Sequence, residues 1–405
     1  MSFQQGLSGL NAAARNLDVI GNNVANANTA GFKESQALFS AVYANSIASS
    51  GAATVGIGTA VTAVQPDFVQ GNITVTSNPL DIAINGSGFF RLDSNGAITY
   101  SRNGQFHLDK DGYIVNATGA RVTGYGVDAS GAVVAANPTA LQVSTADLIP
   151  SATSKAGIQL NLDSRAKTIT AAFNINDATT YDNATSMTVF DSLGNPHTLS
   201  TYFVKTAANT WSVYGAADGV AMTGALGTLA FNPDGTLDAT TSAVPYSVSM
   251  ALTTGATTPL TFPLDFTGST QFGSTFGINA LTQDGFTSGK LAGYAVSEDG
   301  TVLGRYTNGQ SRALGQVVLA SFANPQGLQP LGNNGWGEST SSGQPLVGTA
   351  GTGSLGALQS GAIEESNVDL TQELVDMITA QRVYQANAQT IKTQDQVLNT
   401  LVNLR

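Results

Sequence analysis

The chain has 405 residues, of which only 11% are charged, and its formal net charge is −11. At roughly 100–200 residues per domain, this length predicts about two to four domains. The 16 basic residues do not cluster, which excludes a typical nucleic-acid-binding surface. The absence of cysteine excludes disulfides, thiolate catalysis and cysteine-ligated zinc. No apolar run approaches about 18 residues, so we expect no membrane insertion.

The first predicted element is a helix over residues 3–24. Its apolar residues recur at spacings of four, three or seven, which is the pattern of a heptad seam on one helix face. A run rich in asparagine and glycine follows and predicts the end of the helix. The seam residues are Phe3, Leu7, Leu10, Ala14, Leu17 and Val24.

Alternating apolar and polar residues replace the helical period in the middle of the chain, which predicts β-strands. One spacing recurs there: an apolar residue, two residues, Asn-Gly or Asp-Gly, one residue and another apolar residue. Such dipeptides supply the positive φ angles of type I′ hairpin turns. We therefore expect four hairpins and a fifth turn. The turns are Asn95-Gly96, Asp111-Gly112, Asp234-Gly235, Asp299-Gly300 and Asp191–Asn195.

Changes in composition predict the domain organisation of this mainly β, multidomain chain. Residues 72–147 plus 285–357 form an inner β-domain, and residues 148–284 form an outer β-domain inserted into it. Residues 25–71 plus 358–365 connect the inner domain to a helical terminal domain, formed by residues 1–24 plus 366–405. Stretches rich in Gly and Ser keep backbone freedom and predict soft connectors. In one of them we assign a hinge to Gly351 and Gly353.

A second helix is predicted over residues 366–405, with Ser366 or Asn367 as its cap and acidic residues in its early turns. Its apolar residues again alternate by four and three, with interruptions at Gln381 and Asp395. Two terminal helices that pack only on each other would leave much of this seam exposed. We therefore expect an interface between copies of the chain. Its residues on this helix are Leu370, Leu374, Met377, Tyr384, Ile391, Leu398 and Val402.

The back of this helix carries a polar stripe without acidic residues. Ordinary exposure to solvent explains such a stripe about as well as a specific role does. The alternative is that the stripe lines a water-filled bore, since amides and sparse basic groups hold a passing chain weakly. The residues of this candidate channel lining are Gln385, Gln389, Lys392, Gln396, Asn399 and Asn403.

The sequence contains no catalytic constellation. Residues 351–356 match a GxGxxG pattern, but they lie in low-complexity sequence with no helix directly after them. His107 and His197 lack the partner spacing of a metal site. We therefore expect no enzyme activity, no cofactor and no metal. A secreted enzyme on a β scaffold remains a minor alternative.

Both ends of the chain resemble the signatures of bacterial flagellar axial proteins, the family of rod and hook subunits. The resemblance covers SFQQGLSGLNAAARNLDVIGNNVANANTAGFK at the start and ESNVDLTQELVDMITAQRVYQANAQTIKTQDQVLNTLVNLR at the end. NGSGFFRL and YSRNGQFHLDKDGYIVNATGARVTGY resemble the family's β-domain motifs. Rod subunits are shorter and lack a large central insertion, so the length and the insertion indicate a hook subunit. A distal rod or hook–filament junction subunit is the alternative.

The resemblance implies a structural protein that assembles into a curved, flexible tube outside the cell. Such a tube acts as a universal joint, passing torque from rod to filament, and it encloses an export channel. The implied partners are other copies of the chain, the rod, the hook cap, the junction proteins and the flagellar type III export apparatus. The start of the sequence lacks a signal-peptide pattern, which fits that route. We also expect the terminal helices to become fully ordered only in the polymer, where they form a coiled-coil-like core.

Overall fold

The computed structural model describes residues 2–42, 56–128 and 131–403, and within α3 it describes side chains as far as residue 400. The chain divides into two units. Unit 1 comprises Met1–Thr145, Gly293–Arg305 and Ser311–Arg405, and unit 2 comprises Ala146–Ala292 and Tyr306–Gln310. The mainly β fold with a helix at each end confirms the predicted fold class.

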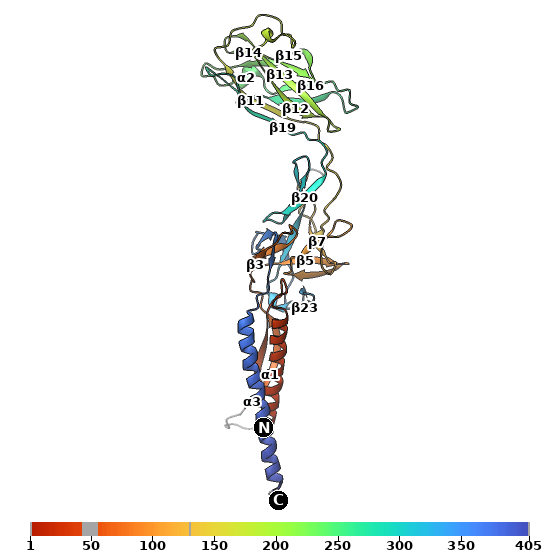
Figure 1. Cartoon of the computed structure of the whole chain (residues 1–405), viewed down its shortest axis with the longest axis vertical. Coiled ribbons are helices and arrows are strands. Elements are labelled where there is room, and N and C mark those ends of the chain that lie inside the picture. The colour runs from red at the N-terminus through yellow and green to blue at the C-terminus, as the bar shows by residue number, and fades with distance from the viewer. Residues whose placement is uncertain (1, 43–55, 129–130, 404–405) are drawn as a thin grey trace. The chain divides into compact units, whose positions relative to one another are not determined.

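The two terminal helices belong to unit 1 and lie side by side (Figure 1). They are α1 (Ser2–Ala25) and α3 (Leu370–Asn403). A two-stranded antiparallel ribbon, β1 (Ser35–Val42) with β2 (Gly58–Pro66), packs along α1. Gln5 and Ser8 attach this ribbon to the helix, because the Gln5 amide donates to the Gly56 carbonyl and the Thr59 N–H donates to Ser8 Oγ. The predicted connector over residues 25–71 thus contains a β ribbon that the sequence analysis did not anticipate.

The β part of unit 1 is built around a sheet with the strand order β20-β21-β22-β9-β5-β6-β24-β23. Its core includes an aromatic cluster of Phe89, Tyr100, Phe322 and Trp336. Two small pairs, β26 with β4 and β27 with β3, bring the segment before α3 back to the start of the domain. The strands are β3 (Ile73–Val75), β4 (Ile82–Asn85), β5 (Phe89–Ser94), β6 (Ala97–Ser101), β7 (Phe106–Leu108), β8 (Ile114–Asn116), β9 (Arg121–Tyr125), β10 (Thr139–Ala140), β20 (Leu291–Val296), β21 (Thr301–Tyr306), β22 (Ser311–Ser321), β23 (Gln329–Gly332), β24 (Gly335–Gly337), β25 (Leu346–Thr349), β26 (Ala357–Ser360) and β27 (Ala362–Glu364).

Unit 2 contains two sheets around one apolar core. One sheet has the order β16-β17-β11-β18, with β19 also paired to β11, and the other has the order β12-β13-β14-β15. Leu160 of the first sheet and Trp211 of the second are both fully buried in this core. Two short 3-10 turns are also present, Ala178–Thr180 in unit 2 and Pro325–Gly327 in unit 1. The other elements of unit 2 are β11 (Ala156–Asp163), β12 (Asn183–Phe190), β13 (Pro196–Ala207), β14 (Thr210–Ala217), β15 (Val220–Ala230), α2 (Ala239–Ser242), β16 (Tyr246–Met250), β17 (Leu260–Asp265), β18 (Thr270–Phe272) and β19 (Gly277–Gln283).

All five predicted turns are present, but only one of them has both central residues at positive φ. Asn95 and Gly96 have φ angles of 53° and 91°, as a type I′ turn requires. At the other four turns only the glycine has a positive φ. In three of them the Asp before that glycine keeps an ordinary φ, and its carboxylate accepts a hydrogen bond in each case. The donor is a backbone N–H at Asp234 and Asp299 and the Lys110 ammonium at Asp111. The prediction of type I′ geometry was therefore wrong at these three Asp-Gly turns, while the turn positions were right; no turn type was predicted for Asp191–Asn195.

Candidate assembly surface of the terminal helices

The contact between α1 and α3 is antiparallel and uses small and polar side chains. Gly6, near the start of α1, lies against Ile391, and a Cβ on Gly6 would come within 3.2 Å of Ile391 Cγ1. Gly9 lies one turn further along and faces Asn387, where a Cβ would come within 2.7 Å of the side-chain oxygen. The absence of side chains at these two glycines lets the helix axes approach closely.

The face of α3 that meets α1 repeats every seven residues. Glu373 and Ala380 are buried and Asn387 is half-buried, while their neighbours on the opposite side of α3 are exposed. The buried residues of α1 include Ala12, Ala13, Ile20 and Asn23. The pairing within one chain is therefore carried mainly by a stripe beside the predicted leucine seam, and Ile391 is a seam residue that also takes part in it.

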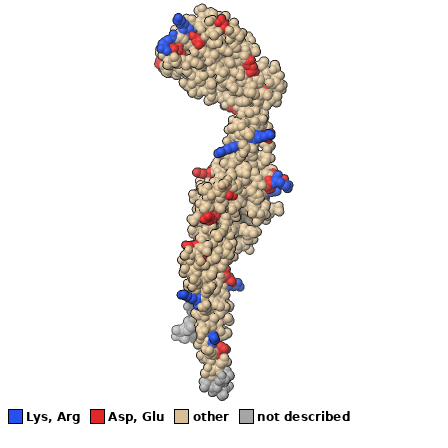
Figure 2. Space-filling model, viewed as in Figure 1, with Lys and Arg blue, Asp and Glu red and all other residues tan. Residues whose placement is uncertain are grey.

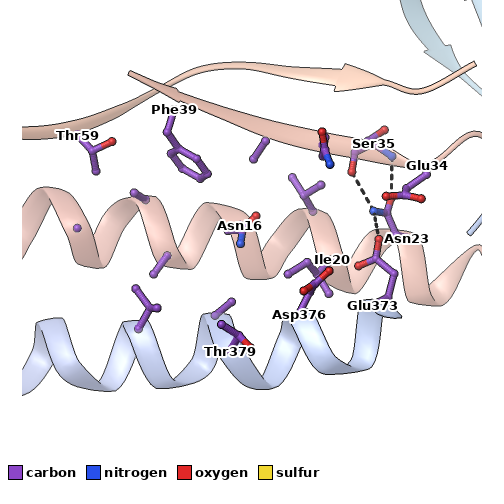
Figure 3. A pocket seen from close by; sticks show the side chains of 18 of the residues that line it. Asn16, Ile20, Asn23, Glu34, Ser35, Phe39, Thr59, Glu373, Asp376 and Thr379 are labelled. Atoms are coloured by element: carbon purple, nitrogen blue, oxygen red, sulfur yellow. Dashed lines mark hydrogen bonds between the residues drawn. The ribbon is translucent and has the colours of Figure 1, made fainter. Parts of the chain in front are cut away.

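A hydrogen-bond network joins the end of α1 to the start of α3 and to the ribbon (Figure 3). The Asn23 amide donates to Glu373 Oε1 over 2.8 Å and to the Ser35 carbonyl over 2.9 Å. The Ser35 N–H in turn donates to Asn23 Oδ1 over 3.0 Å. One asparagine thereby joins α1, α3 and the β1–β2 ribbon.

The same three elements enclose an open groove of about 640 Å³ (Figure 3). Its lining mixes apolar and polar side chains, and Phe39 projects toward α1 from the ribbon. Glu34, Glu373 and Asp376 line one end. Burial raises the pKa of the Glu34 carboxyl above its ordinary value, and the nearby charges of Glu373, Asp67 and Asp376 add to the shift. This end of the groove therefore disfavours further negative charge.

Most of the predicted seam remains accessible to solvent after the helices have paired. The exposed fractions are 46% for Phe3, 43% for Leu7, 46% for Leu374 and 50% for Leu398. Leu370 and Tyr384 are also exposed. The remaining described residues of the predicted interface are half-buried: Leu10, Leu17, Val24, Met377 and Ile391. The side chain of Val402 lies outside the described residues. The assignment of this seam to a polymer interface stays a prediction.

The predicted channel-lining stripe lies on the side of α3 away from α1. Gln385, Gln389, Lys392, Gln396 and Asn399 are all exposed, whereas the α1 contact is made by the stripe through Glu373, Ala380 and Asn387. The side chain of Asn403 lies outside the described residues. Within the described part of the chain these five side chains stay exposed, so the stripe is available either to solvent or to a bore.

The predicted hinge residues, Gly351 and Gly353, lie in a turn between β25 and β26, inside unit 1. Their φ angles are +74° and +58°, and the Gly351 N–H donates to the Gly356 carbonyl over 3.0 Å. Positive φ explains the need for glycine at both positions. Their assignment to a hinge stays a prediction.

The described residues contain no cluster of three or more His, Asp or Glu side chains that could hold a metal ion. His107 is exposed on β7. His197 is buried between two carboxylates, with its Nδ1 2.7 Å from Asp218 Oδ2 and its Nε2 3.3 Å from Asp191 Oδ2. Burial opposes the charge on His197, but the two aspartates outweigh it and raise the pKa of the imidazole. This pairing, which the sequence spacing did not reveal, gives a structural ion cluster.

Most of the surface visible in Figure 2 is uncharged, with acidic and basic side chains scattered singly or in small groups. The terminal helices therefore offer apolar and amide surface, and little charge, to a partner.

Within the described part of the chain, no helix is both long and apolar enough to cross a bilayer.

Comparison with known proteins places four regions of the chain in flagellar families. Residues 3–33 match the flagella basal body rod protein model, and residues 359–404 match the flagellar basal body rod FlgEFG protein C-terminal model. Residues 83–189 match the flagellar hook protein FlgE/F/G D1 domain, and residues 161–286 match the flagellar basal body protein FlaE D2 domain. The matches thus cover both terminal helices and parts of both units.

Three relatives that match the chain over its full length are all flagellar hook proteins. The chain is 47% identical to flagellar hook protein FlgE of Escherichia coli strain K12 and 46% identical to that of Salmonella typhimurium strain LT2, each over 100% of both chains. It is 34% identical to flagellar hook protein FlgE of Rhizobium meliloti, over 100% of this chain and 98% of the relative.

A solved structure shares the fold. The crystal structure of Helicobacter pylori flagellar hook protein FlgE2 aligns with a TM-score of 0.52 at 13% identity, covering 71% of this chain and 99% of that one. The full-length matches favour a hook subunit over a rod subunit, a junction subunit or an enzyme. The chain belongs to the family of bacterial flagellar hook proteins, the structural subunits of the flagellar hook.

Proposed function

We propose that the paired terminal helices form the inner tube of the hook polymer, and that the leucine seam joins neighbouring copies. The observation that carries this proposal is the exposure of Phe3, Leu7, Leu374, Tyr384 and Leu398 after α1 and α3 have already packed on each other. Apolar side chains left exposed along a helical pair indicate an interaction surface when many of them share one seam. A homopolymer supplies the partner, because every copy presents the same seam.

Burial of this seam between copies would contribute to the free energy of assembly. Fully burying a leucine or phenylalanine side chain contributes about 1.5–3 kcal/mol. Because the exposed seam residues are already about half covered, each gains part of that amount. A lone helix of the length of α1 is marginal in water, so packing between copies also stabilises the helices themselves. We infer that the terminal helices are frayed in the free chain and ordered in the polymer.

We propose further that the amide stripe from Gln385 to Asn399 faces the bore of this tube. The stripe lies on the opposite side of α3 from the α1 contact. Amide side chains neither bind apolar segments strongly nor attract opposite charges over distance. Such a lining suits the passage of unfolded subunits of mixed composition.

In this account the hook bends as a universal joint while it transmits torque from the rod to the filament. The β units are stiff because their cores are well packed, which supports that role. The sparse surface charge leaves few ion pairs that could hold neighbouring copies in one fixed position. The subunit is exported through the flagellar type III apparatus and works outside the cell. Its partners are the rod, the hook cap and the hook–filament junction proteins.

The experiment that tests the seam replaces Leu398 with Asp. The variant L398D should fail to polymerise while its β units stay folded, because a buried carboxylate at this site has no partner. The matched control is L398M, which keeps the volume and the apolar character and should assemble normally. Sedimentation measures assembly and circular dichroism measures folding. Normal polymers of L398D would show that the seam is not the interface.

A further inference from the structure

The groove between α1, α3 and the β1–β2 ribbon lies on one flank of the helical pair, and the leucine seam lies on the other. Glu373 and Ala380 are the buried residues of α3 on the side that meets α1. Successive residues of a helix are about 100° apart. Asp376 and Val383, which line the groove, therefore lie to one side of that contact, and the seam residue Leu374 lies to the other.

The receiving surface for this seam cannot be the seam itself. In a helical tube one operation relates each copy to the next, so a surface of one copy meets a different surface of its neighbour. The groove is a hollow on the flank opposite the seam. Its lining includes the apolar side chains of Ala13, Ile20 and Phe39. The helical pair thus has an apolar ridge on one flank and a partly apolar groove on the other.

The acidic end of the groove lacks a counter-charge. Glu34, Glu373 and Asp376 line this end. The Asn23 amide donates to Glu373, and the Gln372 amide donates to Asp376 over 3.1 Å. In the described part of the chain, no Lys or Arg forms an ion pair with any of the three carboxylates. A cation supplied from outside the chain would relieve the repulsion among them.

The far end of the helical pair carries apolar side chains and one such cation. Figure 1 shows α3 continuing past the start of α1, where Gly6 lies against Ile391. Lys392 is exposed and follows Leu374 by about five helical turns, which places it on the seam flank. Three exposed apolar residues lie at the same end. We call these four residues the free end: Phe3, Leu7, Lys392 and Leu398.

The free end and the groove match in charge and in length. All copies in a tube point the same way, so a neighbour's α3 runs parallel to the α3 of the groove. An offset of about 24 Å along the helix brings the neighbour's Lys392 opposite Asp376. The neighbour's Leu398 then lies beside Val383, which is 48% exposed in the single chain. The neighbour's Asp395 lies opposite the uncharged Thr379, clear of the acidic end.

We propose that the groove receives the free end of a second copy, with Lys392 of that copy at the acidic end and Leu398 over Val383. This proposal rests on the proposed function, in which the seam joins neighbouring copies, and it adds the surface that the seam meets. Lys392 borders both the amide stripe and the seam. Its long side chain allows the charge to reach the neighbour while the stem stays at the edge of the bore.

The test exchanges the two charges between copies. The full-length variants D376K and K392E change exposed side chains, so both should fold, as circular dichroism verifies. Each variant alone places like charges together, and its critical concentration for assembly should rise about fivefold. An equal mixture of the two pairs opposite charges at every contact. The mixture should assemble near the parent's critical concentration, measured by sedimentation.

The matched control mixes D376K with R382E, which carries the same charge change on the same helix. Arg382 is exposed but lies away from both the seam flank and the groove. This mixture should assemble no better than D376K alone. Unimpaired single variants, a D376K and K392E mixture that stays impaired, or equal recovery with R382E would each overturn the proposal.

A covalent cross-link tests the apolar part of the contact. The chain has no cysteine, so V383C and L398C introduce single thiols. A short bismaleimide should link the two variants into dimers in mixed polymers, and it should link neither variant to itself. Equal dimer yields in mixed and pure polymers would contradict the pairing. If L398D blocks assembly but charge exchange does not restore it, the seam remains the interface and only the groove is excluded as its partner.

Discussion

The amide of Asn23 in α1 donates a hydrogen bond to Glu373 in α3 across 350 positions of sequence, and the bond is 2.8 Å long and buried. It joins the two ends of the chain at the point where both helices meet the β1–β2 ribbon. The bond thus fixes the register of the two terminal helices when they pair.

Replacing Asn23 with Ala should weaken the polymer. The variant N23A loses the bond to Glu373 and both bonds with the Ser35 backbone, and it leaves a buried carboxylate unsatisfied. Each buried polar group left without a partner costs about 1–3 kcal/mol. We therefore expect assembled N23A hooks to dissociate at a lower urea concentration than the parent. The control N11A, at an exposed position of α1, should dissociate at the parent's concentration.

The stability of unit 2 should depend on pH through His197. Its raised pKa means that folding favours the charged imidazole, so its contribution is complete below the ordinary value of 6.5 and is lost as the pH rises through the raised value. Burial opposes ionisation of Asp191 and Asp218, but their hydrogen bonds, including those with His197, lower both pKa values below the ordinary 3.8. Their contribution is lost as the pH falls. Unit 2 should be most stable between about pH 4 and 6.5.

Urea unfolding followed by Trp211 fluorescence measures this dependence, in a background where Trp336 is replaced by Phe. Trp211 is fully buried in unit 2, so its emission reports on that unit. The variant H197Q should lose most of the change in unfolding free energy between pH 6 and 9. The control H107Q, at the exposed histidine in unit 1, should keep it. An H197Q profile that follows the parent's would refute the assignment.

Proline at Gly351 should destabilise the β-domain of unit 1. The residue has a φ of +74° and its N–H is hydrogen-bonded, whereas proline requires a φ near −65° and has no N–H. We expect G351P to lower the unfolding free energy by more than about 1 kcal/mol. The control G351N tolerates positive φ and keeps the N–H, so it should unfold close to the parent. Folded G351P with stiffer hooks would instead support the hinge interpretation.

Replacing Gln389 and Gln396 with Leu should affect passage through the finished tube. These side chains are exposed and lie away from the α1 contact. An apolar patch in a bore would retain passing unfolded chains. Hooks of the double Leu variant should form, while filament growth beyond them slows. The double Asn variant keeps the amides and should grow filaments at the parent's rate. Lengths measured by electron microscopy decide the outcome.

Local patterns were sufficient to predict the elements of this fold. The 3.6-residue period located both terminal helices, and Asn-Gly and Asp-Gly pairs located the hairpins. The β1–β2 ribbon was missed because its strands flank a low-complexity stretch and find their burial only against α1. Turn type was also misassigned, since an Asp-Gly pair fits either a two-residue turn or a longer turn with only its glycine at positive φ.

Local sequence patterns could not predict contacts between segments that are distant in the sequence. Glu364, Lys33 and Arg102 are isolated charges in the sequence, and only the fold brings them together. The stripe by which α3 meets α1 was overlooked for a similar reason. It consists of Glu373, Ala380 and Asn387, which carry no hydrophobic signal. The more apolar neighbouring stripe dominated the pattern although it is the less buried one in the single chain.

A density map of the assembled hook by electron cryo-microscopy tests the central claim most directly, because it shows which face of α3 meets the bore. The account predicts Gln389 and Gln396 on the lumen wall, with Leu374, Tyr384 and Leu398 in contacts between neighbouring copies. A map with those apolar side chains on the lumen wall and the two glutamines in contacts between copies would contradict it.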